Sequence, residues 1–180
     1  MHRAMLIAFA VLAAGCSAAF PRDALRAVDR EVSAGDLTRD PAAYVGRRVM
    51  VGGDIVATRP MPGETEIEIL SKPLSGDDQP RRGDVSEGRV LARSARFLDP
   101  AIYAEGRRLT VIGTVTGEEQ RKIGELSYRY PVLSTTNLHL WPREVAVPAN
   151  GLPWSYDPWF YPRPWGYGVY GPWLGSPYCW

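Results

Sequence analysis

The sequence predicts a mainly β protein built around one small five-stranded barrel with short helices. Three observations support this prediction: a turn-and-strand unit that occurs twice, apolar residues that alternate along several short segments, and turn-rich segments between them. The chain has 180 residues, with 21 Lys and Arg against 20 Asp and Glu. This length suits one domain with extensions, and the balanced charge gives no indication of nucleic acid binding.

The first residues have the layout of a signal peptide. An unbroken apolar run covers residues 4–14, and small residues stand directly before Cys16. The run is about eleven residues long, whereas a helix that spans a bilayer needs about twenty. The segment resembles a bacterial lipobox, although Ala13 stands where Leu is usual. We therefore predict a lipoprotein signal peptide over residues 1–15, lipidation of Cys16 and a lipidated tether over residues 16–39.

The anchor also predicts a location. Each buried methylene adds about 0.8 kcal/mol of membrane affinity, so three acyl chains would hold the protein almost permanently. Ser17 follows the cysteine, where an Asp would favour retention in the inner membrane, so we expect the outer membrane. The alternative is a soluble periplasmic protein cut near Ala14 or Ala19.

The repeated unit covers residues 40–55 and recurs over residues 99–115, with one inserted residue before the second glycine. In each copy an Asp can cap a helical turn, and the Pro after it fits the first helical position. Gly46 and Gly106 can take the left-handed conformation that ends such a turn. Each copy is therefore expected to form a short helix that leads into a strand.

Alternating apolar residues predict the strands. Gly53 and Gly113 fall at the same inward position of the two repeated strands, where a glycine permits close backbone approach. Ile67 and Ile69 share one face of another strand, which places Glu66 with Glu68 on its exposed face. The five predicted strands are 49–55, 65–70, 89–94, 109–115 and 126–141, with a loop over 73–87 and a polar turn over 117–124.

The order of these elements is strand, strand, strand, short helix, strand, strand. A helix between the third and fourth of five strands is the order of the OB-fold, a small partly open barrel. The sequence therefore favours an OB-like domain over residues 40–146, with a generic β-sandwich as the alternative.

Residues 147–180 form an irregular C-terminal tail rich in Trp, Tyr, Pro and Gly. Three interpretations of this tail stay open: rings that pack back on the barrel, rings at a membrane interface, or docking to a partner protein or glycan. The candidate membrane or partner contacts are Trp154, Trp159, Trp165 and Trp173.

We find no pattern typical of a catalytic or cofactor site. His139 lies in an apolar strand end beside Trp141, where a structural role is expected. Two histidines make a dedicated metal site improbable, and we expect no cofactor. If Cys16 carries lipid, Cys179 has no cysteine partner within the chain. The sequence therefore predicts that the protein is not an enzyme.

Several short motifs, in order, resemble one known family. They include Tyr44-Val45-Gly46, Gly52-Gly53, Phe97-Leu98-Asp99-Pro100, Tyr130-Pro131-Val132 and Leu138-His139-Leu140-Trp141. Together with the lipobox and the aromatic tail, they resemble the Slp family of outer-membrane lipoproteins. The resemblance implies an envelope lipoprotein linked to starvation or stress, and it brings no reaction, ligand or catalytic residue.

Two hypotheses about function follow. The first is a non-catalytic, lipid-anchored protein of the bacterial outer membrane, facing the periplasm, with a structural or interaction role and an envelope protein or glycan as partner. The alternative is a periplasm-facing OB-like module that binds a glycan or a small envelope ligand.

Overall fold

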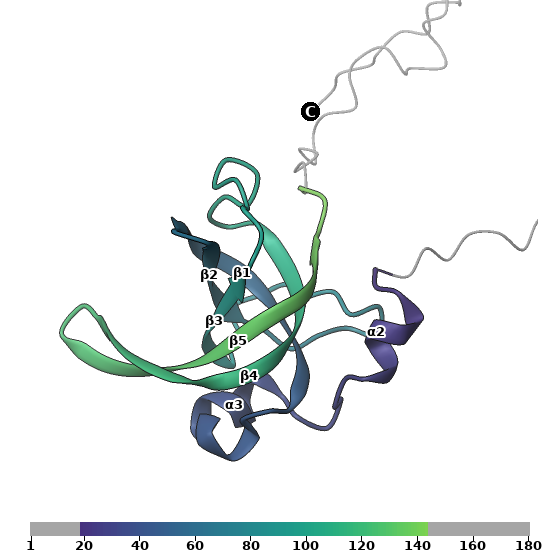
Figure 1. Ribbon diagram of the computed structural model, residues 1–180, viewed down its shortest axis with the longest axis horizontal. Coiled ribbons are helices and arrows are strands. Elements are labelled where there is room, and N and C mark those ends of the chain that lie inside the picture. The colour runs from purple at the N-terminus through teal and green to yellow at the C-terminus, as the bar shows by residue number, and fades with distance from the viewer. Residues whose placement is uncertain (1–18, 144–180) are drawn as a thin grey trace, which may run out of the picture. The chain divides into compact units, whose positions relative to one another are not determined.

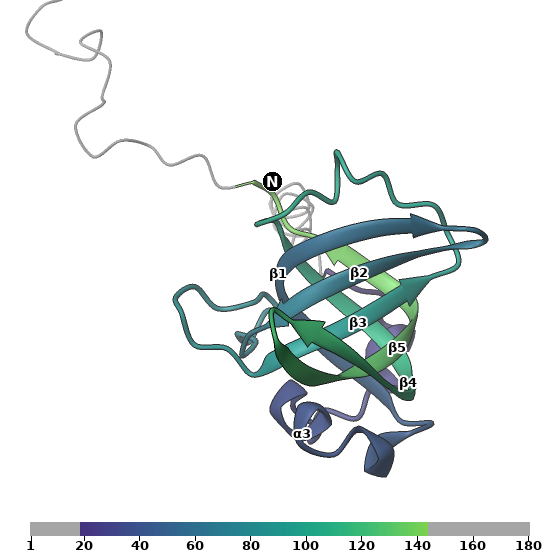
Figure 2. The ribbon, with the colours of Figure 1, turned by 90° about the vertical axis from the view of Figure 1, so that its left-hand side faces the viewer.

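Five strands form a closed barrel in the computed structural model, which describes residues 19–143 (Figures 1 and 2). The strand order around the barrel is β1-β2-β3-β5-β4. All neighbours are antiparallel except β3 and β5, which form a parallel seam from Leu91↔Val132 to Arg93↔Ser134. The predicted mainly β fold is confirmed. The strands are β1 (Arg48–Met61), β2 (Glu64–Ser71), β3 (Gly88–Ser94), β4 (Arg108–Ile123) and β5 (Leu126–Leu140).

Helical structure in the described residues is limited to short segments, α2 (Arg22–Arg26), α3 (Ala34–Arg39) and the 3₁₀ turn η2 (Pro41–Tyr44). Ser33 caps α3: its hydroxyl accepts from the Asp36 amide, and the Asp36 carboxylate accepts from the Ser33 amide. This reciprocal capping box fixes where the helix begins.

The predicted polar turn over residues 117–124 is wrong. β4 continues through this segment to Ile123, and the chain reverses at Gly124, which has φ of 59°. β4 and β5 remain paired as far as Ile123↔Leu126. We call residues 117–132 the hairpin arm, and Figure 1 shows its tip projecting from the barrel. The polar residues that suggested a turn lie instead on a two-stranded ribbon.

The two copies of the repeated unit start differently. The first begins with η2, as predicted, whereas the second has no helix. Its backbone makes one turn, from the Asp99 carbonyl to the Tyr103 amide (2.9 Å), and the Tyr103 carbonyl then accepts from Thr58 of β1 (2.7 Å). This contact with the barrel takes the place of a second helical turn. The predicted helix between the third and fourth strands is therefore wrong, and the OB-fold assignment that used it stays a prediction.

The strands of the two copies pair with each other around a local two-fold axis. Val51 pairs with Val111, its counterpart in the repeat, and Val49↔Gly113 mirrors Gly53↔Leu109. The symmetry extends to the preceding turns, where the Gly46 amide donates to the Val115 carbonyl and the Gly106 amide donates to the Ile55 carbonyl, both at 2.8 Å. The sequence repeat is thus a structural repeat.

The repeat glycines behave as predicted. Gly46 and Gly106 have φ of 84° and 76°, in the left-handed region that favours glycine. A Cβ on Gly53 would lie 2.0 Å from the carbonyl oxygen of Leu70 on β2, and one on Gly113 would lie 2.7 Å from the carbonyl oxygen of Ser134 on β5. Close backbone approach at both positions lets the sheet curve into a small barrel.

Apolar residues that alternate along the strands fill the barrel, as the period of two predicts. Leu37 of α3 is fully buried and closes one end of this core. The core contains Val49, Val51, Ile55, Ile67, Ile69, Val90, Ala92, Leu109, Val111, Val115 and Leu133.

Residues 19–39, which were expected to be part of a tether, pack against the barrel. Phe20 is only 3% exposed and forms a second apolar cluster with Met50 and Ile112. Leu25 and Val28 pack against that cluster. The residues of the predicted tether that precede Ala19 lie outside the described part of the chain.

Candidate functional site

Two glutamates that the sequence placed on an exposed face are buried. Glu66 and Glu68 lie on the outer face of β2 and are 1% and 5% exposed. Arginines from three other strands cover them, with a third glutamate from the hairpin arm. We call this group the charge cluster: Arg59, Glu66, Glu68, Arg89, Arg93, Glu119 and Arg121.

Glu66 is held by two guanidinium groups. Arg121 of β4 donates from Nη1 and Nη2 to its two carboxylate oxygens, at 2.6 and 2.7 Å. Arg93 of β3 donates from Nε and Nη2 to Oε2, at 3.1 and 3.0 Å. Burial alone would raise the pKa of Glu66, but these charged hydrogen bonds outweigh it and hold the pKa below its ordinary value.

Glu68 has a similar set of partners. It accepts from Arg59 Nη2 (3.0 Å), Arg89 Nη1 (2.7 Å) and the Tyr130 hydroxyl (3.0 Å). Burial opposes ionisation here too, yet the two arginines and the tyrosine hold the pKa of Glu68 below its usual range. Burial and the neighbouring Glu68 carboxylate raise the pKa of Tyr130, so its hydroxyl keeps its proton.

The charge cluster fastens the base of the hairpin arm to β2 and β3. Arg121 comes from the arm and bonds both Glu66 and Glu119, while Arg93 bonds the same two glutamates from β3. Small barrels of the OB type bind ligands on the face of strands two and three. In this chain ion pairs occupy that face, so a ligand there would have to displace them.

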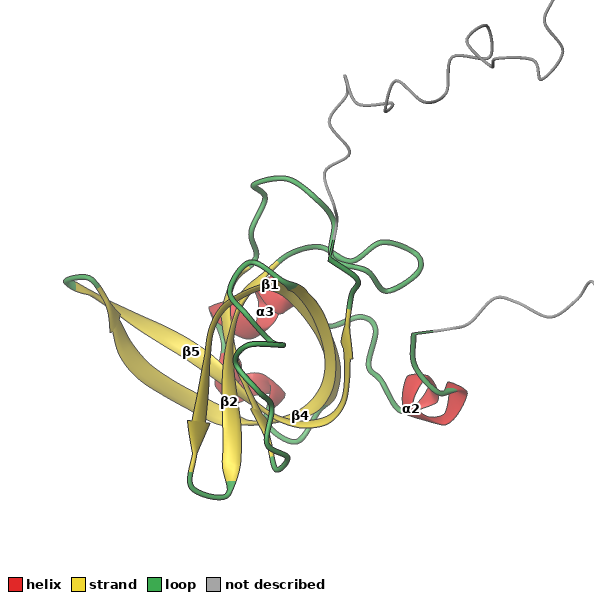
Figure 3. Cartoon of the chain, turned by 90° about the horizontal axis from the view of Figure 1, so that it is seen from above, coloured by secondary structure: helices red, strands yellow, loops and turns green. Residues whose placement is uncertain are grey.

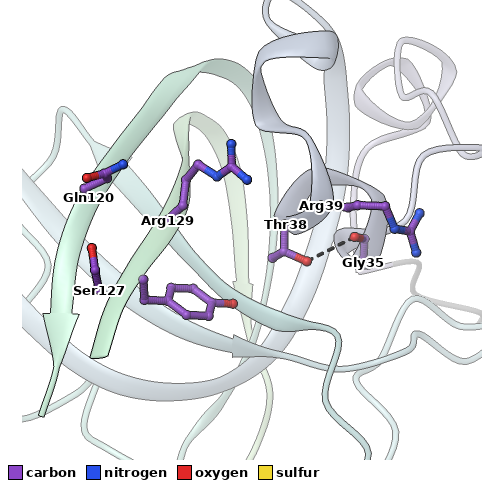
Figure 4. Close-up of a pocket in the computed structure, with 7 residues that line it drawn as sticks. Gly35, Thr38, Arg39, Gln120, Ser127 and Arg129 are labelled. Carbon is purple, nitrogen blue, oxygen red and sulfur yellow. Dashed lines mark hydrogen bonds between the residues drawn. The ribbon is translucent and has the colours of Figure 1, made fainter. Parts of the chain in front are cut away.

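A groove on the described surface lies between α3 and the hairpin arm and has a volume of about 630 Å³. Figure 4 shows Gln120, Ser127 and Arg129 of the arm on one side, with Thr38 and Arg39 of α3 on the other. Tyr128 also lines it, and its hydroxyl accepts from the Arg89 amide at 2.9 Å. Its lining side chains offer hydrogen-bond donors and acceptors, with two guanidinium groups.

Both arginines of the groove have acidic neighbours at its rim. Arg39 donates to Asp36 at 3.0 Å, and Arg129 Nη1 lies 3.9 Å from Glu118 Oε2. Arg129 is half exposed, so these ion pairs are weak and open to exchange with an anion. The groove suits a polar or anionic ligand better than an apolar one.

A third carboxyl group, that of Glu87, has a raised pKa, unlike those of Glu66 and Glu68. Glu87, in the loop before β3, is partly buried, and burial together with the nearby Asp36 carboxylate raises its pKa. Its backbone carbonyl accepts from the Thr38 hydroxyl at 3.0 Å. Among the described carboxyl groups, Glu87 is the one whose shift suits proton donation.

Most of the predicted site residues lie outside the described part of the chain. This applies to the lipidation site Cys16 and to Trp154, Trp159, Trp165 and Trp173 of the tail. No described helix is long and apolar enough to cross a membrane. Within residues 19–143, no group of three or more His, Cys, Asp or Glu side chains could hold a metal ion.

His139 and Arg107 fall within the described residues. The His139 ring packs edge-on against Trp141 and Phe20, with centroids 4.4 and 6.0 Å apart, which agrees with the structural role predicted for it. Arg107 donates to the carbonyls of Ile102 and Trp141 at 3.0 and 2.7 Å. It ties the end of β5 to the turn before β4.

The family of this chain is shown by its similarity to known proteins. The family described as "Outer membrane lipoprotein Slp family" matches residues 13–167. The chain is 37% identical over 131 residues to the uncharacterized lipoprotein YeaY of Escherichia coli, covering 71% of this chain and 65% of YeaY. It is 31% identical over 142 residues to the outer membrane protein Slp of the same organism, covering 77% of this chain and 69% of Slp.

An uncharacterized protein from Haemophilus influenzae is 32% identical over 129 residues, covering 71% of this chain and 67% of that protein. Among solved structures, a putative aspartyl-tRNA synthetase from Leishmania major Friedlin matches with a TM-score of 0.41 and 15% identity, over 63% of this chain and 21% of that chain. That structural likeness carries no argument about function.

The chain therefore belongs to the outer membrane lipoprotein Slp family, as the sequence motifs indicated. Membership supports lipid anchoring in the outer membrane. The match to YeaY spans slightly less than two thirds of YeaY's own length.

Proposed function

We propose that this chain is a non-catalytic lipoprotein that acts structurally, or as an interaction surface, in the bacterial envelope during stress or starvation. The barrel faces the periplasm in this proposal, and Cys16 carries the lipid. The link to starvation and stress rests on the family resemblance.

The charge cluster is the observation that supports a non-catalytic role. A general acid or base works best when its pKa lies near the operating pH. The pKa values of Glu66 and Glu68 are instead lowered, because each carboxylate accepts hydrogen bonds from two arginines. Such carboxylates stay ionised and hold the arm in place.

The chemical part of this proposal is tested at Glu87, the described carboxyl group best suited to proton donation. We expect the Glu87→Gln protein to complement a deletion strain as well as the unaltered protein does. Loss of complementation, with an unchanged circular dichroism spectrum and unchanged abundance in the outer membrane, would contradict the non-catalytic role.

The cellular part is tested by abundance. We expect the amount of the protein in the outer-membrane fraction, measured by quantitative mass spectrometry, to rise several-fold on nutrient limitation. A constant amount in growing and starved cells would remove the stress role and leave the structural one.

The second candidate function is binding of a glycan or small anionic envelope molecule in the groove between α3 and the hairpin arm. Its support is the pair Arg39 and Arg129 beside Tyr128 in a polar groove of about 630 Å³. A ligand that binds only the folded state raises its thermal stability. We expect millimolar anionic glycan fragments to raise the melting temperature, and the double variant Arg39→Ala, Arg129→Ala to abolish that rise. The exposed Arg96→Ala variant is the control, and no rise in the unaltered protein contradicts the binding function.

A further inference from the structure

The described chain is attached to the barrel very close to the proposed lipid anchor. Phe20 is the fourth residue after Cys16, and its ring is buried against Met50 and Ile112. Its centroid also lies 6.0 Å from that of His139 on β5. The backbone continues into α2, where the Leu25 amide donates to the Pro21 carbonyl at 3.2 Å. The stretch of chain that connects the anchored Cys16 to the folded unit, which we call the path, therefore ends at Ala19.

The length of that path limits how far the folded unit can move from the bilayer. An extended chain spans at most about 3.6 Å per residue, so the three steps from Cys16 to Ala19 cover at most about 11 Å. A compact unit of the size described here has a radius of gyration of about 14 Å, which corresponds to a diameter of about 36 Å. The path is thus shorter than the radius of the unit, and the unit cannot turn its opposite end to the membrane.

We propose that the surface around α2 and Phe20 is the membrane-facing side of this protein, with phospholipid headgroups as its partner. The proposal rests on the lipid anchor at Cys16 from the proposed function. The hairpin arm then points away from the bilayer. Figures 1 and 3 both show α2 and the tip of the arm at opposite ends of the folded unit.

The exposed side chains of α2 suit such a partner. Arg22 and Arg26 are exposed on this helix, and guanidinium groups bind phosphate oxygens through paired hydrogen bonds. Asp23, the acidic residue of the helix, lies 3.4 Å from Arg26 Nη1 in a fully solvated pair. Solvated pairs of this kind are weak, so Arg26 can exchange the carboxylate for a lipid phosphate.

Energy transfer from a protein label to labelled headgroups tests the orientation. The natively acylated protein, carrying Cys179→Ser, receives one new thiol for a donor dye, either Asp23→Cys on α2, which keeps both arginines, or Leu126→Cys at the tip of the arm. Each protein is reconstituted in phosphatidylethanolamine–phosphatidylglycerol vesicles with an acceptor on a fraction of the headgroups. We expect at least about threefold higher transfer from position 23 than from position 126, because the two labels differ in height by about one domain diameter. Equal transfer from the two positions overturns the proposal.

Two variants that lengthen the path test whether the short connection to the anchor is what orients the folded unit. A Gly/Ser insertion of about twelve residues between Ala18 and Ala19 adds a flexible reach of about 20 Å and should make the two transfer values converge. Phe20→Ala should do the same by freeing the segment before Asp29, whose amide is bound to the Arg48 carbonyl at 2.8 Å. Phe97→Ala, at an exposed phenylalanine, is the matched control and should leave the difference intact.

The outcomes distinguish the orientation from the anchor. Intact mass without acyl chains on Cys16 overturns the anchor and the orientation together. An acylated protein with a transfer difference that survives the insertion overturns the short connection as the cause. An acylated protein with a difference that the insertion and Phe20→Ala both remove supports the proposal.

Discussion

Replacing Glu66 by Gln should destabilise the protein far more than the same change at Glu64. Both residues lie on the same face of β2, two positions apart, and both are glutamates near Arg93. Glu66 is 1% exposed and accepts four hydrogen bonds from two guanidinium groups, whereas the Glu64 side chain is 38% exposed and lies 3.9 Å from Arg93. The pair is therefore a matched comparison of a buried and a surface charge.

The size of the effect follows from the partners that remain. Removing one member of a buried ion pair typically costs about 3–5 kcal/mol, because the other charge stays buried. Here Arg93 and Arg121 keep Glu119 as a partner and are partly exposed, which lowers the cost. We expect a loss of about 2–3 kcal/mol in the free energy of unfolding for Glu66→Gln, and less than about 1 kcal/mol for Glu64→Gln.

Urea denaturation of a soluble Cys16→Ser form, followed by circular dichroism, measures both values. Hydrogen exchange adds a local readout, since amides of the hairpin arm should lose protection in Glu66→Gln before those of β1. Equal losses for the two variants, or a Glu66→Gln protein as stable as the parent, would refute the assignment of the charge cluster as the fastening of the arm.

The same cluster predicts a pH dependence. A carboxyl group whose pKa is lower in the folded than in the unfolded state adds stability above its unfolded value of about 4.3, and this is lost as the pH falls through the folded value. Since the pKa values of Glu66 and Glu68 are both lowered, stability should hold from pH 7 to about 5 and fall in more acidic solution. The fall should be shallower in Glu66→Gln, and an unchanged slope would contradict the role of this carboxylate.

Three further substitutions have expected outcomes of their own. Glu87→Gln should raise the stability at pH 7 and change it little at pH 4. The pKa of Glu87 is raised in the folded state, so the stabilising contribution of this carboxyl group is present below its unfolded pKa and lost as the pH rises. Thermal unfolding at the two pH values measures the effect, and destabilisation at pH 7 would contradict it. Gly53→Ala should prevent or severely weaken folding, since its Cβ would lie 2.0 Å from a carbonyl oxygen of β2. The control Gly76→Ala has open space around the new Cβ, and its free energy of unfolding should stay within about 0.5 kcal/mol of the parent. Equal expression and stability of the two variants would show that the barrel does not need the close approach at Gly53. Tyr128→Phe should cost about 1–3 kcal/mol, because the Arg89 amide loses its acceptor; a stability change below about 0.5 kcal/mol in urea denaturation would mean that water replaces the hydroxyl.

Local sequence patterns could predict the features of the fold that depend only on residues close together in the chain. The repeated unit, the strands that follow each copy and the role of Gly53 depend on a turn, a period of two and a missing side chain. All of these can be read within about ten residues. The structure confirms the helical turn of the first copy, the strands of both copies and the close approach at Gly53, but not the helix of the second copy. The family that the ordered motifs indicated is confirmed by the comparison with known proteins.

The charge cluster could not be predicted in this way because its members are far apart along the chain. Arg93 and Arg121 lie 27 and 55 residues from Glu66. Strict alternation on β2 therefore suggested a solvated glutamate face, and the polar residues around Glu119 suggested a turn. A signal was present in the glutamates at alternate positions of residues 64–68 and in Arg89 and Arg93 of the next strand, because opposite charges on neighbouring strands stabilise their pairing.

The attachment of Phe20 was missed for a related reason. A single aromatic residue after a signal peptide has no periodicity, and its burial depends on a hollow formed by Met50 and Ile112 on neighbouring strands. Only the folded barrel shows that the connection to the anchor is short.

The two-fold pairing of the repeated strands has a consequence for assembly. In oligomers, contact between two identical patches is an isologous interface, and it closes on itself without a third partner. Here both patches belong to one chain, so Val51 and Val111 meet as two subunits of a dimer would. A lone copy of the unit would expose a strand edge able to recruit another molecule. Because the chain carries the second copy itself, that edge is already occupied, and the repeated strands offer no open edge to a neighbouring molecule.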